Sequence, residues 1–89
     1  AALVRDVKRG ADQLEETVPH SFQQALWEAR SAVATGALKM SLPAYRIAAT
    51  RARDKQHRRT AWCELATIAK RANAKDALGE ATRRCKAER

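Results

Sequence analysis

Residues 21–40, which read SFQQALWEARSAVATGALKM, decide the fold class of this 89-residue chain. Apolar side chains recur there at spacings of three or four residues, the period of one face of a helix. The members of this face are Phe22, Leu26, Ala29, Val33, Ala37 and Met40. Ser21 and Gln24 fit a capping box at the helix start, and Gly36 is expected to end or loosen the helix. The pattern predicts an amphipathic helix.

The rest of the chain has the same helical period, and no alternation is long enough for a strand. Four further helices are predicted. One covers residues 2–17, one starts after Ser41 as its N-cap, one covers 61–72, and one covers 74–87 with Asn73 as its N-cap. Residues 53–60 are all polar. We expect them to continue the helix that starts at Ser41, with a polar loop as the alternative.

The composition is compatible with either a helical bundle or a basic disordered tail. Leu, Ile, Val and Phe together number only 14 residues, which is typical of disordered chains. Ala, Glu, Lys, Leu and Arg together number 51, of which 20 are alanine, and this is typical of long helices. Because the small apolar residues fall on helix faces between capping residues, we expect a folded bundle with a thin core.

We therefore predict one all-α domain over residues 1–89, built as a small antiparallel helical bundle or as an elongated helical hairpin or coiled coil. It should contain three to five helices, and the helix over 21–40 should pack on the two helices that follow it. The predicted core residues are Phe22, Leu26, Val33, Met40, Tyr45, Ile47, Trp62, Leu65, Ile68 and Leu78. Such a core predicts modest stability, or help from a partner.

The two cysteines, Cys63 and Cys85, are too few for a disulfide framework. We expect two buried free thiols in a reducing compartment, the cytosol or an organelle matrix. One disulfide is the alternative if their helices pack antiparallel. The first residue is Ala1, so we expect a processed or trimmed chain. No stretch approaches the ~18 apolar residues of a membrane span, so we expect a soluble protein without a transmembrane segment.

The positive charge of the chain lies in its second half. The formal net charge is +8, and residues 45–89 carry 13 basic and five acidic residues, whereas residues 1–44 carry five of each. The candidate partner-binding residues are Arg46, Arg51, Arg53, Lys55, Arg58, Arg59 and Trp62. In a helix, Arg51, Lys55 and Arg58 share one side. This segment therefore predicts binding to an anionic partner.

Several functions use such a segment. We expect a non-catalytic interaction protein, an adaptor or accessory subunit of a larger assembly, whose basic half docks on an acidic protein surface. The alternative is sequence-tolerant binding of RNA or DNA by the same residues, and anionic lipid is a third kind of partner. A processed secreted effector or toxin fragment that acts by protein binding is a further alternative. Trp27 or Trp62 would anchor the partner if either is exposed.

No catalytic, metal or cofactor site is predicted. His20, His57, Cys63 and Cys85 do not have the spacing of metal ligands. The sequence also has no evident acid pair, phosphate-binding loop or dinucleotide motif. We therefore expect a protein that is not an enzyme and has no cofactor. The oligomeric state stays open.

Overall fold

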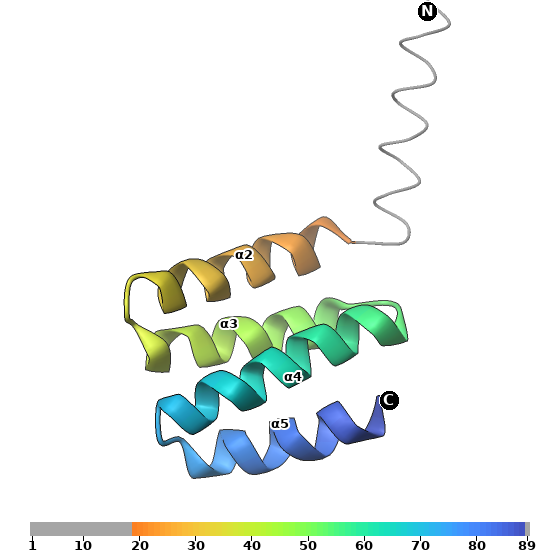
Figure 1. Cartoon of the computed structure of the whole chain (residues 1–89). Coiled ribbons are helices and arrows are strands. Elements are labelled where there is room, and N and C mark those ends of the chain that lie inside the picture. The colour runs from red at the N-terminus through yellow and green to blue at the C-terminus, as the bar shows by residue number, and fades with distance from the viewer. Residues whose placement is uncertain (1–18, 89) are drawn as a thin grey trace, which may run out of the picture.

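A computed structural model describes residues 19–88, and these residues form four α-helices and no strand. The helices are α2 (His20–Ala34), α3 (Leu38–Arg51), α4 (Lys55–Arg71) and α5 (Lys75–Ala87) (Figure 1). The prediction of a small all-α bundle is confirmed. The helix predicted over residues 2–17 lies outside the described residues.

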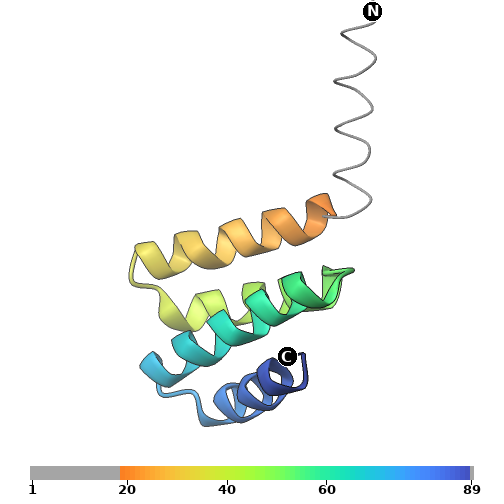
Figure 2. The ribbon, with the colours of Figure 1, turned by 45° about the vertical axis from the view of Figure 1, so that its right-hand side comes forward.

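Consecutive helices are antiparallel neighbours, so that α2 packs on α3, α3 on α4, and α4 on α5 (Figures 1 and 2). The four helices therefore follow one another in chain order, with α2 and α5 on opposite sides of the row. Contacts between α2 and α4 also occur through side chains. The ring centroids of Phe22 and His57 are 5.1 Å apart, and Arg30 forms an ion pair with Glu64. The expected packing of α2 on the next two helices is thus direct at α3 and extends to α4 through these side chains.

The turns after α2 and after α4 have the same geometry. Gly36 follows α2 with a φ of 84°, and the amide of the next residue donates to the carbonyl of Ala32 at 2.8 Å. Asn73 follows α4 with a φ of 59°, and the amide after it donates to the carbonyl of Ala69 at 2.9 Å. Both are Schellman turns, which need a left-handed residue such as glycine or asparagine. The prediction that Gly36 ends the helix is confirmed, whereas Asn73 ends α4 rather than capping α5.

The connection between α3 and α4 shows that the expected continuous helix over 53–60 is wrong. α3 ends at Arg51, and the next residue is extended. Asp54 then caps α4, because its side chain accepts a hydrogen bond from the amide of His57 at 2.7 Å. This bond satisfies one of the amides that a helix start leaves without an internal partner. The polar run therefore contains the bend between two helices, and the residues after Asp54 form the first turns of α4.

The caps predicted at two serines are also wrong. Pro19 is the N-cap of α2, which begins at His20, so Ser21 already lies inside the helix. α3 begins at Leu38, immediately after the tight turn, and Ser41 lies within its first turns. Ser41 is fully buried, and its hydroxyl donates to the carbonyl of Leu38 at 2.6 Å. A serine inside a helix satisfies its hydroxyl in this way.

Alanine forms most of the core. Of the described residues, 14 apolar ones are buried, and eight of these are alanine. Small side chains let the axes of neighbouring helices approach closely. The predicted core residues that the structure buries are Phe22, Leu26, Tyr45, Trp62, Leu65 and Ile68. Val33 and Leu78 are partly buried.

The prediction that Met40 and Ile47 belong to the core is wrong, because they are 76% and 50% exposed. The buried face of α3 contains Ser41, Tyr45 and Ala48. Met40 and Ile47 lie one position or more from these residues, and each position rotates a side chain by about 100° around the helix axis. α3 therefore presents apolar surface outside the core.

A disulfide joins Cys63 of α4 to Cys85 of α5, whose Cα atoms are 4.9 Å apart. The two helices are antiparallel, which is the condition for the disulfide alternative. The expectation of two free thiols is wrong. The expectation of a reducing compartment, which depended on free thiols, is not supported.

Candidate partner-binding site

Five of the predicted site residues surround the bend between α3 and α4. We call them the basic surface: Arg51, Arg53, Lys55, Arg58 and Arg59. Arg51 ends α3, Arg53 lies in the bend, and the other three belong to the first turns of α4. Lys55 and Arg59 are four residues apart, so they share one side of α4. The fold thus gathers this part of the predicted site at one end of the molecule.

Two of the predicted cations are neutralised by glutamates of α5 or its end. Arg46 of α3 pairs with Glu80, and the Nε atom of Arg58 lies 3.1 Å from Oε1 of Glu88. Arg58 also donates to the carbonyl of Arg53 at 2.9 Å. Their guanidinium groups therefore hold the helices and the bend together, and they offer less charge to a partner.

The other cations of the basic surface point their charge to solvent. Arg51, Lys55 and Arg59 are exposed, and within residues 19–88 they form no hydrogen bond or ion pair through their side chains. Arg53 is exposed as well. Arg51, Lys55 and Arg59 can therefore contact an anionic group without first breaking an internal ion pair.

The position of these cations is unfavourable for α4 itself. The N-terminal end of a helix carries a partial positive charge, and a cation there costs about 0.3–1 kcal/mol at low ionic strength. The first turn of α4 contains no acidic residue. The carboxylate of Asp54 precedes it, and the hydrogen bond from the His57 amide lowers the pKa of that carboxyl group. Lys55 thus adds positive charge where the helix already has it, and Arg59 follows one turn later on the same side.

Trp62 does not belong to this surface. It is 8% exposed, and the guanidinium carbon of Arg84 lies 5.7 Å from the centroid of its ring. Trp27 on α2 is 69% exposed. A tryptophan must be exposed to anchor a partner, so Trp27 meets this condition and Trp62 does not.

A side-chain network links α2, α3 and α4. Arg30 donates two hydrogen bonds to the carboxylate of Glu64, at 3.0 and 2.5 Å, and the hydroxyl of Tyr45 donates to the same carboxylate at 3.1 Å. The hydrogen bond to Glu64 raises the pKa of Arg30. Burial, with the nearby Glu64 charge, raises the pKa of Tyr45 to about 12. The network joins three helices and fixes α3 and α4, which carry the basic surface.

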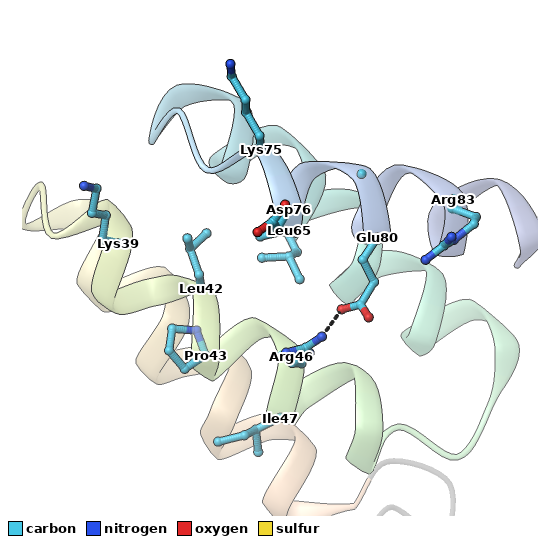
Figure 3. A pocket seen from close by; sticks show the side chains of 12 residues that line it. Lys39, Leu42, Pro43, Arg46, Ile47, Leu65, Lys75, Asp76, Glu80 and Arg83 are labelled. Atoms are coloured by element: carbon cyan, nitrogen blue, oxygen red, sulfur yellow. Dashed lines mark hydrogen bonds and ion pairs between the residues drawn. The ribbon is translucent and has the colours of Figure 1, made fainter.

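A groove that the sequence did not reveal lies between α3 and α5 (Figure 3). Leu42, Pro43 and Ile47 line it from α3, Gly79 lines it from α5, and Leu65 of α4 lies between the two helices. Of the apolar residues that line it from α3, the sequence pattern had assigned only Ile47 a place, and that place was the core.

Metal binding and membrane crossing find no support in the described residues. Within residues 19–88, no group of three or more His, Cys, Asp and Glu side chains is arranged to hold a metal ion. In the same part of the chain, every helix is too short or too polar to span a membrane.

No protein-family model matches the sequence, and comparisons with curated proteins and with solved structures find no significant similarity.

Proposed function

We propose that this chain is a non-catalytic interaction protein, an adaptor or accessory subunit, whose basic surface docks on an acidic face of a partner protein. The observation that carries the proposal is the position of Lys55 and Arg59. Both are exposed and have no internal ion pair among the described residues, and Lys55 lies where the dipole of α4 disfavours a cation. Residues that lower the stability of a fold often serve its function.

An acidic protein surface fits the basic surface better than a single-stranded nucleic acid does. Single-strand binding uses exposed aromatic rings on which bases stack. Three of the four aromatic residues are buried, and Trp27 belongs to α2 rather than to the basic surface. Asp54 and Glu88 also lie beside the cations and pair with His57 and Arg58. Such mixed charge suits a protein face, and duplex RNA or DNA remains the alternative partner.

The disulfide supports an oxidising compartment as the place of this interaction. Disulfides persist in secreted proteins and in oxidising compartments, and are rare in the cytosol. The Cys63–Cys85 bond therefore favours the alternative in which the chain acts as a secreted effector by protein binding.

Fluorescence anisotropy tests the proposal with three probes: a labelled Glu-rich peptide, a labelled duplex RNA and vesicles that contain phosphatidylserine. The peptide should bind, and its affinity should fall about fivefold in the variant Lys55→Gln/Arg59→Gln, because an exposed ion pair contributes about 0.2–1 kcal/mol. The matched control is Lys70→Gln/Arg71→Gln, which removes the same charge from the opposite end of α4. An equal loss in both variants, or tighter binding of duplex RNA or vesicles, would contradict the proposal.

A further inference from the structure

The groove between α3 and α5 has a volume of about 930 Å³ and is open to solvent on one side of α4 (Figure 3). Because each helix is antiparallel to the next, α3 and α5 run in the same direction on the two sides of α4. Leu42 and Ile47 of α3 and Leu65 of α4 give the groove an apolar lining. Ile47 is half exposed, so part of this apolar surface is in contact with water.

The length of the groove matches a short helical segment. Its lining extends over residues 39–47 of α3 and 75–83 of α5. A rise of 1.5 Å per residue gives about 12 Å along each wall. Two turns of an amphipathic helix cover this length, with apolar side chains at i, i+3 or i+4, and i+7 facing the floor.

Cations dominate the rim of the groove. The charged residues of its lining are Lys39, Arg46, Lys75, Asp76, Glu80 and Arg83. Arg46 and Glu80 neutralise each other in an ion pair across the groove (Figure 3). Lys39 and Lys75 lie at the starts of α3 and α5, whose N-terminal ends add positive potential at the same mouth. Asp76 offsets only part of this charge, so an occupant with carboxylates is favoured.

Gly79 leaves room for an occupant at the α5 wall of the groove. It lies in the interior of α5, where glycine destabilises a helix by roughly 0.8–1 kcal/mol relative to alanine. Apart from its chain neighbours and the adjoining backbone of α5, no heavy atom of the described residues lies within 4 Å of the position that a Cβ atom would take there. Packing inside the described chain therefore does not require glycine. Because glycine has no side chain, the backbone of another chain can approach α5 closely at this position.

We propose that this groove binds an amphipathic helix of an acidic partner protein. The inference rests on the proposed function and names the structural form of the partner. The apolar face of the partner helix packs on Leu42 and Ile47, with the nearly buried Leu65 at the floor between them and α5, and its backbone passes close to Gly79. Its flanking carboxylates contact Lys39 and Lys75. The groove supplies shape recognition, and the basic surface supplies attraction to the rest of the acidic partner.

Two peptides with one composition test this proposal by fluorescence anisotropy. The first is a stapled helix with leucines at i, i+4 and i+7 and glutamates on both flanks. The second contains the same residues with the leucines spread around the helix. The amphipathic peptide should bind at least about 10-fold more tightly, because buried apolar anchors dominate binding energies. Equal affinity for the two peptides would overturn the proposal.

The variant Gly79→Leu locates the binding site. The leucine side chain enters open space, so the variant should fold, and circular dichroism checks this. It should lower the affinity for the amphipathic peptide about 10-fold or more. The matched control, Gln24→Leu, adds the same side chain at an exposed position of α2, outside the groove, and should leave the affinity within about twofold. Unchanged binding by Gly79→Leu would overturn the proposal.

Further outcomes separate this inference from the proposed function. If both peptides bind equally and Lys55→Gln/Arg59→Gln still weakens them, the groove inference fails while the proposed function stands. If neither helical peptide binds but the Glu-rich peptide does, the groove inference alone fails, and if none of the three peptides binds, both fail. Sedimentation of the wild-type chain tests a second copy as the occupant. A dimer that Gly79→Leu dissociates would replace the partner helix by self-association and overturn the proposal.

Discussion

Loss of the Cys63–Cys85 disulfide should destabilise the fold strongly. The bond joins residues 22 positions apart and connects α4 to α5. In the chain-entropy model, closing a loop of this length lowers the entropy of the unfolded chain, and this stabilises the fold by about 3 kcal/mol. For a domain of this size, 1 kcal/mol corresponds to roughly 4–8 °C in Tm. Reduction should therefore lower Tm by about 12–24 °C.

Thermal unfolding followed by far-UV circular dichroism, with and without a phosphine reductant, measures this shift. Both cysteines are partly exposed, so the reductant can reach the bond. The double variant Cys63→Ser/Cys85→Ser should unfold near the Tm of the reduced wild type, and the reductant should not change its Tm. A wild-type Tm that moves by less than about 3 °C on reduction would contradict this prediction, because the bond would then contribute under about 1 kcal/mol.

The remaining predictions concern turns and titrating groups. In urea unfolding, Gly36→Ala should lower the free energy of unfolding by about 1–2 kcal/mol, because the φ of Gly36 is 84° and therefore left-handed. Gly79→Ala should raise the free energy of unfolding by up to about 1 kcal/mol, because the added Cβ meets open space. Effects of the same sign in the two variants would contradict these assignments. An absorbance titration of Tyr45, the one tyrosine of the chain, should show a midpoint of about 12, against about 10 in denaturant. Since the folded state favours the neutral phenol, stability should fall as pH rises from about 10 to about 12, and a native midpoint near 10 would argue against its burial. Because the pKa of Asp54 is lowered in the folded chain, its contribution should be complete above about pH 4 and lost as pH falls through the lowered pKa. Asp54→Ala should thus lower Tm more at pH 6 than at pH 2, and equal losses at both pH values would contradict the capping role.

The helical fold was predictable because helix periodicity is a local property. The apolar stripe that begins at Phe22 is visible within four turns of chain, and its buried members form the core contact with α3. The helix starts were less predictable, because several residues compete for each cap. Pro19 took the place predicted for Ser21, and the turn at Gly36 let α3 begin before Ser41.

The sequence predicted the basic surface but not which of its cations are paired. The run of cations around the bend is a local feature, but the ion pairs of Arg46 and Arg58 involve glutamates 34 and 30 residues away. The sequence pattern has no signal for such tertiary contacts. The exposure of Met40 and Ile47 escaped prediction for a related reason. α3 has apolar residues on more than one side, and only the positions of α2 and α4 decide which side is buried.

We propose that Lys55 and Arg59 serve a partner rather than the fold. The most direct test is the free energy of urea unfolding of Lys55→Gln/Arg59→Gln beside that of Lys70→Gln/Arg71→Gln at low ionic strength. We predict that the first variant gains about 0.3–1 kcal/mol, because Lys55 opposes the dipole of α4. The second should lose a similar amount, because Lys70 and Arg71 complement the dipole. A loss of stability in the first variant would contradict the account, since the two cations would then serve the fold itself.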